Sequence, residues 1–493
     1  MDYGGLWRVN KEVSGKVNIF WFRQDLRLED NPALQAALKT KLPLIPLYIW
    51  DPEGEGEWLP GGASRWWLHR SLESLHLELV KRGSALVLQE GNSEKVFLEI
   101  LSRYPVQGIY WNHRYEPLIL NRDKKLKIKL ESRGIRVESF HGSLLFPPDS
   151  VLKEEGTSYK VFTPFWKRCL RQTIHERTSG SPSLFPPVPS KAISLPLEKL
   201  KLNPAVAWDT GLKKTWQPGS LQALAQLERF LKEGLSRYPE ARDRPDQEGT
   251  SRLSPYLHFG EISPLRIWNA CRRAELTTSQ PGIIRGSETF LRELGWREFG
   301  YHLLIHFPHT PQSPLREEFN RFPWRTDIRP LDAWQQGQTG YPIIDAGMRQ
   351  LWQTGWMHNR VRMIVASFLV KDLLHSWQEG SKWFWEALVD ADLANNTLGW
   401  QWAGGCGADA APFFRIFNPI LQGEKFDSLG TYVKTFCPEL RELPTQYIHH
   451  PWLAPDPILK SAGITLGKNY PSPIIDHSLA RTRALQSFAM IKK

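Results

Sequence analysis

Four stretches in the C-terminal half of the chain carry residue types that can do chemistry. In the first, residues 249–254 (GTSRLS), three hydroxyls and an arginine stand beside a glycine turn. Backbone N–H groups, hydroxyls and a guanidinium together suit a phosphate or pyrophosphate. Serine or threonine ahead of a helix also serves as a simple N-cap, so this segment alone leaves both interpretations open.

The second stretch, residues 290–304, reads as one helix that carries Arg292, Glu293 and Trp296. Spacings of three and four residues place these side chains on neighbouring parts of the helix surface. A carboxylate beside an indole can hydrogen-bond to an extruded base and stack on it. The alternative is an ordinary amphipathic helix with a salt bridge.

The third stretch gathers aromatic, amide and basic groups at the start of a predicted helix, namely Trp356, Asn359, Arg360, Arg362 and Met363. His358 lies among them, but no second ligand follows at the fourth residue, as a metal site on a helix would require. The sequence therefore predicts a structural or hydrogen-bonding histidine and no metal.

The fourth stretch begins with Asp390 and Asp392 and continues through Asn396, Trp400 and Trp402 into a glycine-rich turn. Paired aspartates serve general acid–base catalysis or magnesium binding. Asp390 can instead pair with Arg362, which would explain a buried charge. The spacing alone does not choose between these roles.

The composition limits the class of protein. The 493 residues include 63 Lys and Arg against 52 Asp and Glu, which gives a net charge of +11. This charge favours an anionic partner, most often nucleic acid. A basic surface without a specific partner is the alternative. The four cysteines form no C-x-x-C pair, and no run approaches the ~20 apolar residues of a membrane span. We therefore expect a protein of a reducing compartment with no membrane partner.

The elements that position these residues fall into two kinds. Short apolar runs alternate with amphipathic stretches up to about residue 141, and the runs predict strands at residues 17–22, 42–50, 84–89, 107–112 and 135–140. This order predicts a Rossmann-like parallel sheet with right-handed crossovers. No G-x-G-x-x-G follows the first strand, so a dinucleotide held there in the usual way is not expected.

The rest of the chain has a different character. A Pro- and Ser-rich segment predicts a long connecting loop over the surface, and helical patterns follow it almost to the end. The predicted helices include residues 342–355 and 359–377. We predict an α/β domain at 1–145, a linker at 146–220 and an all-α domain at 221–493.

Six motifs taken together resemble the photolyase/cryptochrome family, and most closely its cyclobutane pyrimidine dimer (CPD) photolyases of the bacterial or plant-cryptochrome-like type. They occupy residues 20–34, 249–264, 293–299, 339–351, 355–374 and 390–419. The resemblance implies an N-terminal α/β antenna domain and a C-terminal helical domain that holds FAD in a folded conformation. It also implies a light-driven carbon–carbon lyase that acts on UV-damaged DNA.

The resemblance places the flavin contacts on residues of the helical domain. They are Tyr238, Thr250, Ser251, Arg252, Leu253, Ser254, Phe290, Arg362, Asp390, Ala391, Asp392 and Asn396. Asn396 matches the position that faces flavin N5, where photolyases usually have Asn, plant cryptochromes Asp and insect cryptochromes Cys. A neutral amide can stabilise reduced flavin without supplying a ready proton, so Asn396 favours repair over signalling.

The resemblance also implies the substrate. Photolyases of (6-4) photoproducts have His at the positions of Asn359 and Met363, whereas Glu293 and Trp296 match the pattern for pyrimidine dimers. The predicted catalytic residues are Glu293, Trp296, Asn359, Met363 and Asn396. The lesion is flipped out, Trp296 stacks on it, and Glu293 and Asn359 hydrogen-bond to it. Excited reduced FAD then donates one electron, which returns after the ring splits.

Three further sets follow from the resemblance. The DNA contacts would be Arg242, Arg244, Arg297, Arg360, Gln422 and Lys425. The electron-transfer chain that photoreduces oxidised FAD would be Trp400, Trp377 and Trp324. An antenna chromophore would lie at Glu116: methenyltetrahydrofolate is expected, with a deazaflavin or an empty site as alternatives.

The rival class is a blue-light photoreceptor, a cryptochrome with the same fold and flavin. The expected repair enzyme would act as a monomer in a bacterial cytoplasm, bound to DNA in the nucleoid. Asn396 and the set of Glu293, Trp296, Asn359 and Met363 favour repair. The single-strand-preferring DASH type differs after the aspartate pair and is the less favoured alternative.

Overall fold

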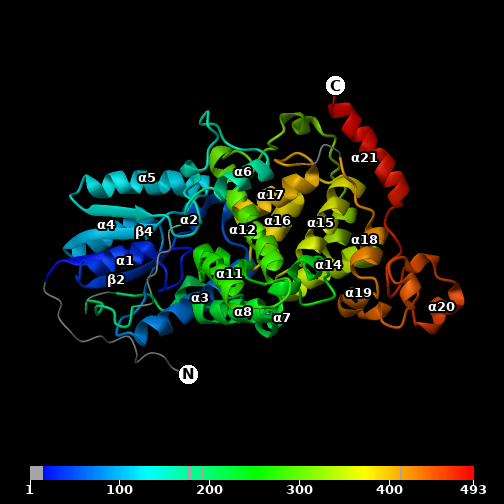
Figure 1. Cartoon of the computed structure of the whole chain (residues 1–493). Helices are drawn as coiled ribbons and strands as arrows, with labels where there is room; N and C mark the ends of the chain where they lie inside the picture. Colours follow the sequence, from blue (N-terminus) through cyan, green and yellow to red (C-terminus); the bar gives the residue numbers. More distant parts are fainter. Residues whose placement is uncertain (1–14, 175–179, 181, 190–192, 411–413, 493) are drawn as a thin grey trace.

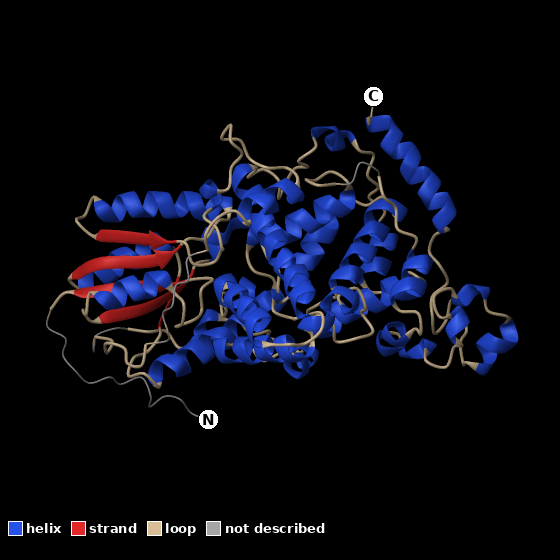
Figure 2. Ribbon diagram, in the orientation of Figure 1, coloured by secondary structure: helices blue, strands red, loops and turns tan. Residues whose placement is uncertain are grey.

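A five-stranded, all-parallel sheet forms one end of the molecule, and helices form the rest (Figures 1 and 2). The computed structural model describes residues 15–174, 180, 182–189, 193–410 and 414–492. The predicted strands are all present, in the spatial order β3-β2-β1-β4-β5. They are β1 (Val17–Phe22), β2 (Leu44–Trp50), β3 (Val87–Glu90), β4 (Val106–Asn112) and β5 (Arg136–Phe140). The predicted fold class is confirmed.

The helices between the strands cover both faces of the sheet. They are α1 (Pro32–Lys39), the short α2 (Pro52–Glu55), α3 (Gly62–Val80), α4 (Ser93–Arg103) and α5 (Pro117–Glu131). Successive residues of a strand point to opposite faces. Accordingly, Ile19 and Trp21 belong to one hydrophobic cluster and Phe20 and Phe22 to another. Burial of β1 on both faces explains why five of its six residues are apolar, with Asn18 as the exception.

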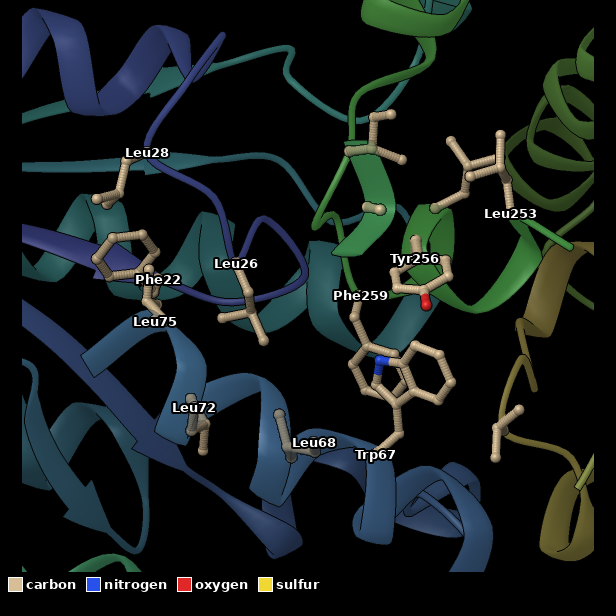
Figure 3. Packing of buried hydrophobic residues seen from close by; sticks show 14 of the residues in the cluster. Phe22, Leu26, Leu28, Trp67, Leu68, Leu72, Leu75, Leu253, Tyr256 and Phe259 are labelled. Atoms are coloured by element: carbon tan, nitrogen blue, oxygen red, sulfur yellow. The ribbon is translucent and has the colours of Figure 1, made fainter. Parts of the chain in front are cut away.

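The second of these clusters continues into the helical part of the chain (Figure 3). Trp67 of α3 stacks on Phe259 with a ring separation of 6.1 Å and meets Tyr256 edge-on at 5.0 Å. Both partners lie at or just after α10 (Ser254–His258). The sheet domain and the helical domain therefore share one core, which fixes their relative position.

The helical domain is built of fourteen described α-helices that begin with α8. They are α8 (Ser220–Glu233), α9 (Tyr238–Ala241), α10, α11 (Pro264–Thr277), α12 (Ile283–His306), α13 (Ile328–Gln335), α14 (Pro342–Thr354), α15 (Asn359–Ser367), α16 (Trp377–Ala387), α17 (Leu393–Gly404), α18 (Pro419–Phe426), α19 (Thr431–Phe436), α20 (Asp456–Ser461) and α21 (His477–Ile491). Among the residues that the structure describes, no helix combines the length and the apolar character needed to cross a membrane.

The predicted single helix over residues 359–377 is wrong. The α-helix α15 ends at Ser367 and passes into a π-helical turn over Phe368–Asp372. Leu374 then adopts a left-handed backbone conformation with φ of 57°. A new helix, α16, begins at Trp377, where the Ser376 side chain accepts a hydrogen bond from the Gln378 N–H. The chain therefore forms two α-helices, α15 and α16, in place of one.

The segment expected to be a surface linker, residues 146–220, contains structure of its own. It includes α6 (Phe162–Cys169) and α7 (Thr210–Thr215). Phe162 and Phe165 of α6 are buried in a cluster with Phe299 of α12. The segment therefore does more than cross the surface, because it contributes a wall to the helical domain beside α12.

Candidate functional site

A cavity of about 1060 Å³ opens among α12, α15, α16 and α17. Its lining brings together twelve of the predicted residues, eleven from three separate motifs and Arg242 from outside them. They are Arg242, Glu293, Trp296, Asn359, Arg360, Arg362, Met363, Asp390, Ala391, Asp392, Asn396 and Trp400. Residues more than 150 positions apart in the sequence thus meet in one site, as the resemblance implies.

Asp392 and Asn396 are positioned by the start of α17. Asp392 is its N-cap, and its carboxylate accepts a hydrogen bond from the Asn395 N–H at 2.9 Å. The Asn396 amide nitrogen donates to the carbonyl (3.1 Å) and the hydroxyl (2.9 Å) of Ser381 on α16. Because the carbonyl oxygen can only accept, the nitrogen must face Ser381. The amide oxygen of Asn396 is therefore left as an acceptor at the cavity wall.

Asp392 also lies at the centre of a buried polar network. The Tyr301 hydroxyl of α12 donates to its Oδ2 at 2.5 Å, and His258 Nδ1 lies 3.6 Å from the same oxygen. Burial by itself raises the pKa of Asp392, but His258, Arg297 and the Tyr301 hydroxyl outweigh it, and the pKa falls well below its usual range. The carboxylate is thus ionised at the cavity wall.

The predicted pairing of Arg362 with Asp390 is confirmed. Arg362 Nη2 lies 2.9 and 3.1 Å from the two carboxylate oxygens, and its Nε donates to the Met357 carbonyl at 2.8 Å. The Asp390 side chain is only 3% exposed, so the pair neutralises a charge that would otherwise be costly at this depth. It holds α15 against the turn that precedes α17.

The groups predicted to meet the lesion lie at the mouth of the cavity. The Trp296 ring stacks on Phe162 at 3.8 Å and 8°. Asn359 and Met363 stand one turn apart on α15, with the amide nitrogen 4.0 Å from the sulfur. Glu293 accepts a hydrogen bond from Arg242 Nη1 at 2.5 Å.

The remaining predicted flavin contacts do not line this cavity. Residues 250–254 run into α10 beside it, with Arg252 in a left-handed conformation. Trp356 links them to the site, since its Nε1 donates to the Ser254 hydroxyl at 3.4 Å and its ring lies 5.2 Å from the Arg252 guanidinium. Tyr238 and Phe290 are buried against each other with ring centres 5.3 Å apart.

The three predicted electron-transfer tryptophans differ in their exposure. Trp400 lines the cavity and is 2% exposed, and Trp377 at the start of α16 is also 2% exposed. Trp324 is half-buried. The Arg325 N–H donates to the Leu374 carbonyl at 2.8 Å, which ties the chain beside Trp324 to the turn just before Trp377.

The predicted DNA contacts divide into five residues that are at least partly exposed and one, Arg297, that is buried. Arg360 lines the cavity and lies 4.5 Å above the Phe426 ring at the end of α18, the helix that carries Gln422 and the exposed Lys425. Arg244 is ion-paired with Asp246 at 2.6 Å and partly exposed. The prediction of Arg297 as a DNA contact is wrong. Its side chain is buried, its Nη1 donates to the Ser143 carbonyl at 2.7 Å, and its guanidinium lies 5.0 Å from the Tyr301 ring. It cannot reach DNA.

Glu116 lines a second, smaller cavity of about 210 Å³ between the sheet domain and the helical domain. Its carboxylate is ion-paired with Arg114 at 3.0 Å, and Arg114 also bridges to Glu55 at 2.5 Å. Trp58, Trp385 and His258 contribute to the walls. Ala391 lines both cavities, so the two sites are separated at that point by a single stretch of chain.

Several residues of the main cavity were not predicted from the sequence. Lys160 and Val161 come from the segment expected to be a linker, and Arg316, Asn395 and Trp402 complete the wall. Asn395 and Trp402 lie inside the recognised motif over residues 390–419, so their place in that motif could have indicated that they line the site. No pattern marked Lys160, because it reaches the cavity only through the packing of α6 on α12.

His358 is confirmed as a structural histidine. It is the N-cap of α15, and its Nδ1 accepts a hydrogen bond from the Arg360 N–H at 3.2 Å. Burial lowers the pKa of His358 to about 4 from its ordinary 6.5. Only the neutral ring can accept this hydrogen bond, so the start of α15, with Asn359 and Arg360, depends on that ionisation state.

We expect a loss of stability in acid that is traceable to this cap. Between pH 6.5 and about 4 the unfolded chain binds a proton at His358 that the folded protein does not, so stability falls as the pH is lowered, by at most about 3 kcal/mol. His358→Asn keeps the cap without titrating. Denaturation curves at pH 7.5 and 4.5 should therefore show a smaller loss in the variant. An equal loss in both proteins would contradict this prediction.

The cavity fits a flavin dinucleotide. Its volume lies above the ~300–1,000 Å³ usual for small-molecule pockets. Its walls offer aromatic rings, the Asn396 amide oxygen, the ionised Asp392 and the Arg362–Asp390 pair. Ring surfaces and a fixed hydrogen-bond acceptor suit the planar heterocycle of the flavin. The hydroxyls and the arginine of residues 250–254, which contact Trp356 beside the cavity, would hold the pyrophosphate.

Comparison with known proteins agrees with this geometry. The family model for the FAD binding domain of DNA photolyase matches residues 290–490, and that for DNA photolyase matches residues 18–187. The chain is 47% identical to a deoxyribodipyrimidine photo-lyase of Agrobacterium fabrum, over 96% of this chain and 98% of that one. It is 40% identical to cryptochrome-1 of Arabidopsis thaliana, over 97% of this chain and 71% of that one.

The solved structures give the same result. A bacterial class III photolyase from Agrobacterium tumefaciens superposes with a TM-score of 0.92 at 46% identity, covering 98% of this chain and 99% of that one. The fold and the site therefore define a light-dependent flavoprotein of the two-domain type. The chain belongs to the DNA photolyase/cryptochrome family, with FAD as its cofactor, and the prediction of an enzyme of the photo-lyase class is confirmed.

Proposed function

We propose that this protein repairs cyclobutane pyrimidine dimers in DNA under blue light. One observation carries the proposal: a single cavity is lined both by the lesion set (Glu293, Trp296, Asn359 and Met363) and by five of the groups assigned to the flavin, Arg362, Asp390, Ala391, Asp392 and Asn396. A base flipped into this cavity would meet a stacking surface, a carboxylate and an amide beside the cofactor. Reduced FAD, when bound and excited, supplies the electron that splits the dimer.

The protein's own contribution is to bind, orient and hold charge. Arg362 and Asp390 neutralise each other, so the cavity gains no unpaired charge from them. The Asn396 oxygen, fixed by Ser381, offers an acceptor to a ring N–H and carries no proton to give away. That combination suits a flavin kept in its reduced form, which is the form that repair needs.

At the mouth, shape and hydrogen bonding select the lesion. Trp296 is backed by Phe162, so its stacking face is held in place before a base arrives. Met363 and Asn359 offer an apolar contact and an amide on one face of α15. A dimer stacks and pairs poorly in the duplex, which lowers the cost of flipping it into this site.

The second candidate function is blue-light signalling, favoured by the 40% identity to a plant cryptochrome. The same cavity and cofactor would serve it. Against it stands Asn396, because an aspartate at this position could supply a proton and the amide cannot. Signalling would also leave the lesion groups at the mouth without a role.

For the antenna we propose methenyltetrahydrofolate in the cavity at Glu116. The site lies beyond the carboxyl ends of the strands, where open α/β sheets hold their ligands. Two tryptophans offer stacking surfaces for a pterin. A deazaflavin is the alternative ligand.

The experiment uses the chemically reduced, FAD-loaded protein and a duplex with one CPD, under blue light and in darkness. A duplex with one (6-4) photoproduct is treated in parallel, and restored pyrimidines are counted. We expect light-dependent repair of the CPD alone. Repair of the (6-4) duplex alone would overturn the substrate assignment, and no repair of either would leave the photoreceptor as the function.

A further inference from the structure

Two charged side chains of the cavity lining, Glu293 and Arg242, form an ion pair with each other. Glu293 is proposed to hydrogen-bond to the flipped base, and Arg242 is predicted to contact a DNA phosphate. In the DNA-free protein, however, Arg242 Nη1 donates to Glu293 Oε1 at 2.5 Å. A phosphate that takes this N–H, or a base N–H that takes Oε1, must displace the other group of the pair.

The surroundings make this pair exchangeable. The Arg242 and Glu293 side chains are 23% and 27% exposed, so water and a phosphate both have access. Ion pairs at this exposure are weak, because solvent screens them. The Arg242 guanidinium lies 5.6 Å from the Tyr238 ring, and Asp243 Oδ1 lies 4.0 Å from its Nε.

A neighbouring pair shows the same arrangement. Arg360 Nη2 lies 2.9 Å from Asp243 Oδ1, and Arg360 rests above the Phe426 ring. At the mouth of the cavity, then, the cations expected to hold DNA phosphates are already balanced by carboxylates. DNA must compete with these carboxylates for the arginines.

We propose that Arg242 masks Glu293 until a DNA phosphate next to a flipped base takes the arginine over. This inference rests on the proposed function and assigns Arg242 a second role, as a specificity-determining residue. The phosphate gains a guanidinium, and the released carboxylate gains the N–H of the base. Phosphate binding and exposure of the base-binding carboxylate are thus one exchange.

The exchange discriminates against undamaged DNA. There a phosphate can take Arg242 only by leaving the Glu293 carboxylate to water. Water replaces the charged partner only in part at a side chain that is 27% exposed, so a phosphate gains less from Arg242 on undamaged DNA than beside a flipped base. The flipped base instead offers the carboxylate a directed N–H donor.

The test measures DNA affinity in darkness for the FAD-loaded protein, with duplexes that differ only in one CPD, at several salt concentrations. Glu293→Gln weakens the pair and frees Arg242. We expect it to bind the undamaged duplex about threefold to tenfold more tightly, with a salt dependence steeper by about one phosphate contact. Its affinity for the CPD duplex should fall.

Glu240→Gln is the matched control. Glu240 lies on α9, is exposed, and pairs with Arg285 at 2.8 Å, outside the cavity. This substitution changes the net charge by the same amount as Glu293→Gln. It should therefore raise the affinity for both duplexes by the same small factor and leave the salt dependence of binding unchanged. If Glu293→Gln behaves in the same way on undamaged DNA, the mask is overturned.

Arg242→Gln gives a second, independent measurement. With the mask, it should weaken binding of the CPD duplex at least several-fold more than binding of the undamaged duplex. Equal weakening of both would show a plain phosphate contact and overturn the proposal. A wild-type protein without preference for the CPD duplex would refute the proposed substrate instead, while the undamaged-duplex arm would still decide whether Arg242 is masked.

Discussion

Replacing Trp400 by phenylalanine is expected to slow the light-driven reduction of bound FAD by about tenfold or more, which corresponds to at least ~1.4 kcal/mol in the barrier. Trp400 lines the cavity, Trp377 belongs to the same hydrophobic cluster, and both indoles are almost fully buried. Phenylalanine keeps the ring that meets Phe384 edge-on at 4.9 Å, but it is far harder to oxidise than an indole. The fold and the FAD content should therefore survive.

The measurement follows the flavin absorption under blue light with an external reductant present. Trp402→Phe is the control, since Trp402 also lines the cavity but is not part of the proposed chain, and it should reduce at nearly the normal rate. Once reduced chemically, the Trp400→Phe protein should repair a CPD as the wild type does. Normal photoreduction in Trp400→Phe would exclude this route.

Gly380→Ala is expected to destabilise the protein by about 1–3 kcal/mol or more, as overpacking of a core does. Gly380 lies on α16 directly against Trp400, and an added Cβ would come closer than 3.0 Å to three atoms of the indole ring. The ring is buried and cannot swing into solvent. Either α16 or Trp400 must move, and both line the cavity, so the FAD content should also drop.

Chemical denaturation and the ratio of FAD to protein measure both effects. Gly300→Ala in α12 is the matched control, because its added Cβ would have no neighbour closer than 3.4 Å. Alanine favours a helix over glycine by up to ~1 kcal/mol, so this variant should be at least as stable as the wild type. If the two variants are equally stable, the contact between Gly380 and Trp400 is not a tight one.

Much of the fold could be predicted because its signals are local. The strands are short apolar runs, and the alternation of strand and helix leaves a parallel sheet as the natural arrangement. Residues 342–355 show a helical period with Pro342 at the start, and α14 spans Pro342–Thr354. These strands and helices depend mainly on residues close to one another in the sequence, so the sequence alone is enough to predict them.

The break in the predicted helix over residues 359–377 depends instead on distant contacts. The local sequence is apolar and helical in period throughout. Leu374 nevertheless takes a left-handed conformation, and its carbonyl accepts the Arg325 N–H from a separate part of the chain. A left-handed leucine is unfavourable by itself, so tertiary structure imposes it.

The candidate site likewise has some contacts that the sequence predicts and others that it does not. The pairing of Arg362 with Asp390 was predictable because both lie in recognised motifs. The partners of Glu293 and Trp296 were not, since Arg242 is 51 residues away and Phe162 lies in the segment taken for a linker. Arg297 was misplaced although it follows Trp296 directly. Successive residues project about 100° apart around a helix, and that rotation carries Arg297 from the cavity into the interior.

The chain at Ala391 has a consequence for how the two ligands influence each other. Ala391 lines both the large cavity and the small cavity at Glu116, while Asp390 and Asp392 line only the large one and Leu393 only the small one. A ligand that orders this stretch of chain from one side lowers the entropy cost of binding on the other. Such linkage is reciprocal, so each ligand would raise the affinity for the other by the same factor. The antenna molecule proposed for the small cavity would therefore influence FAD binding through Ala391 to the extent that it orders this stretch of chain.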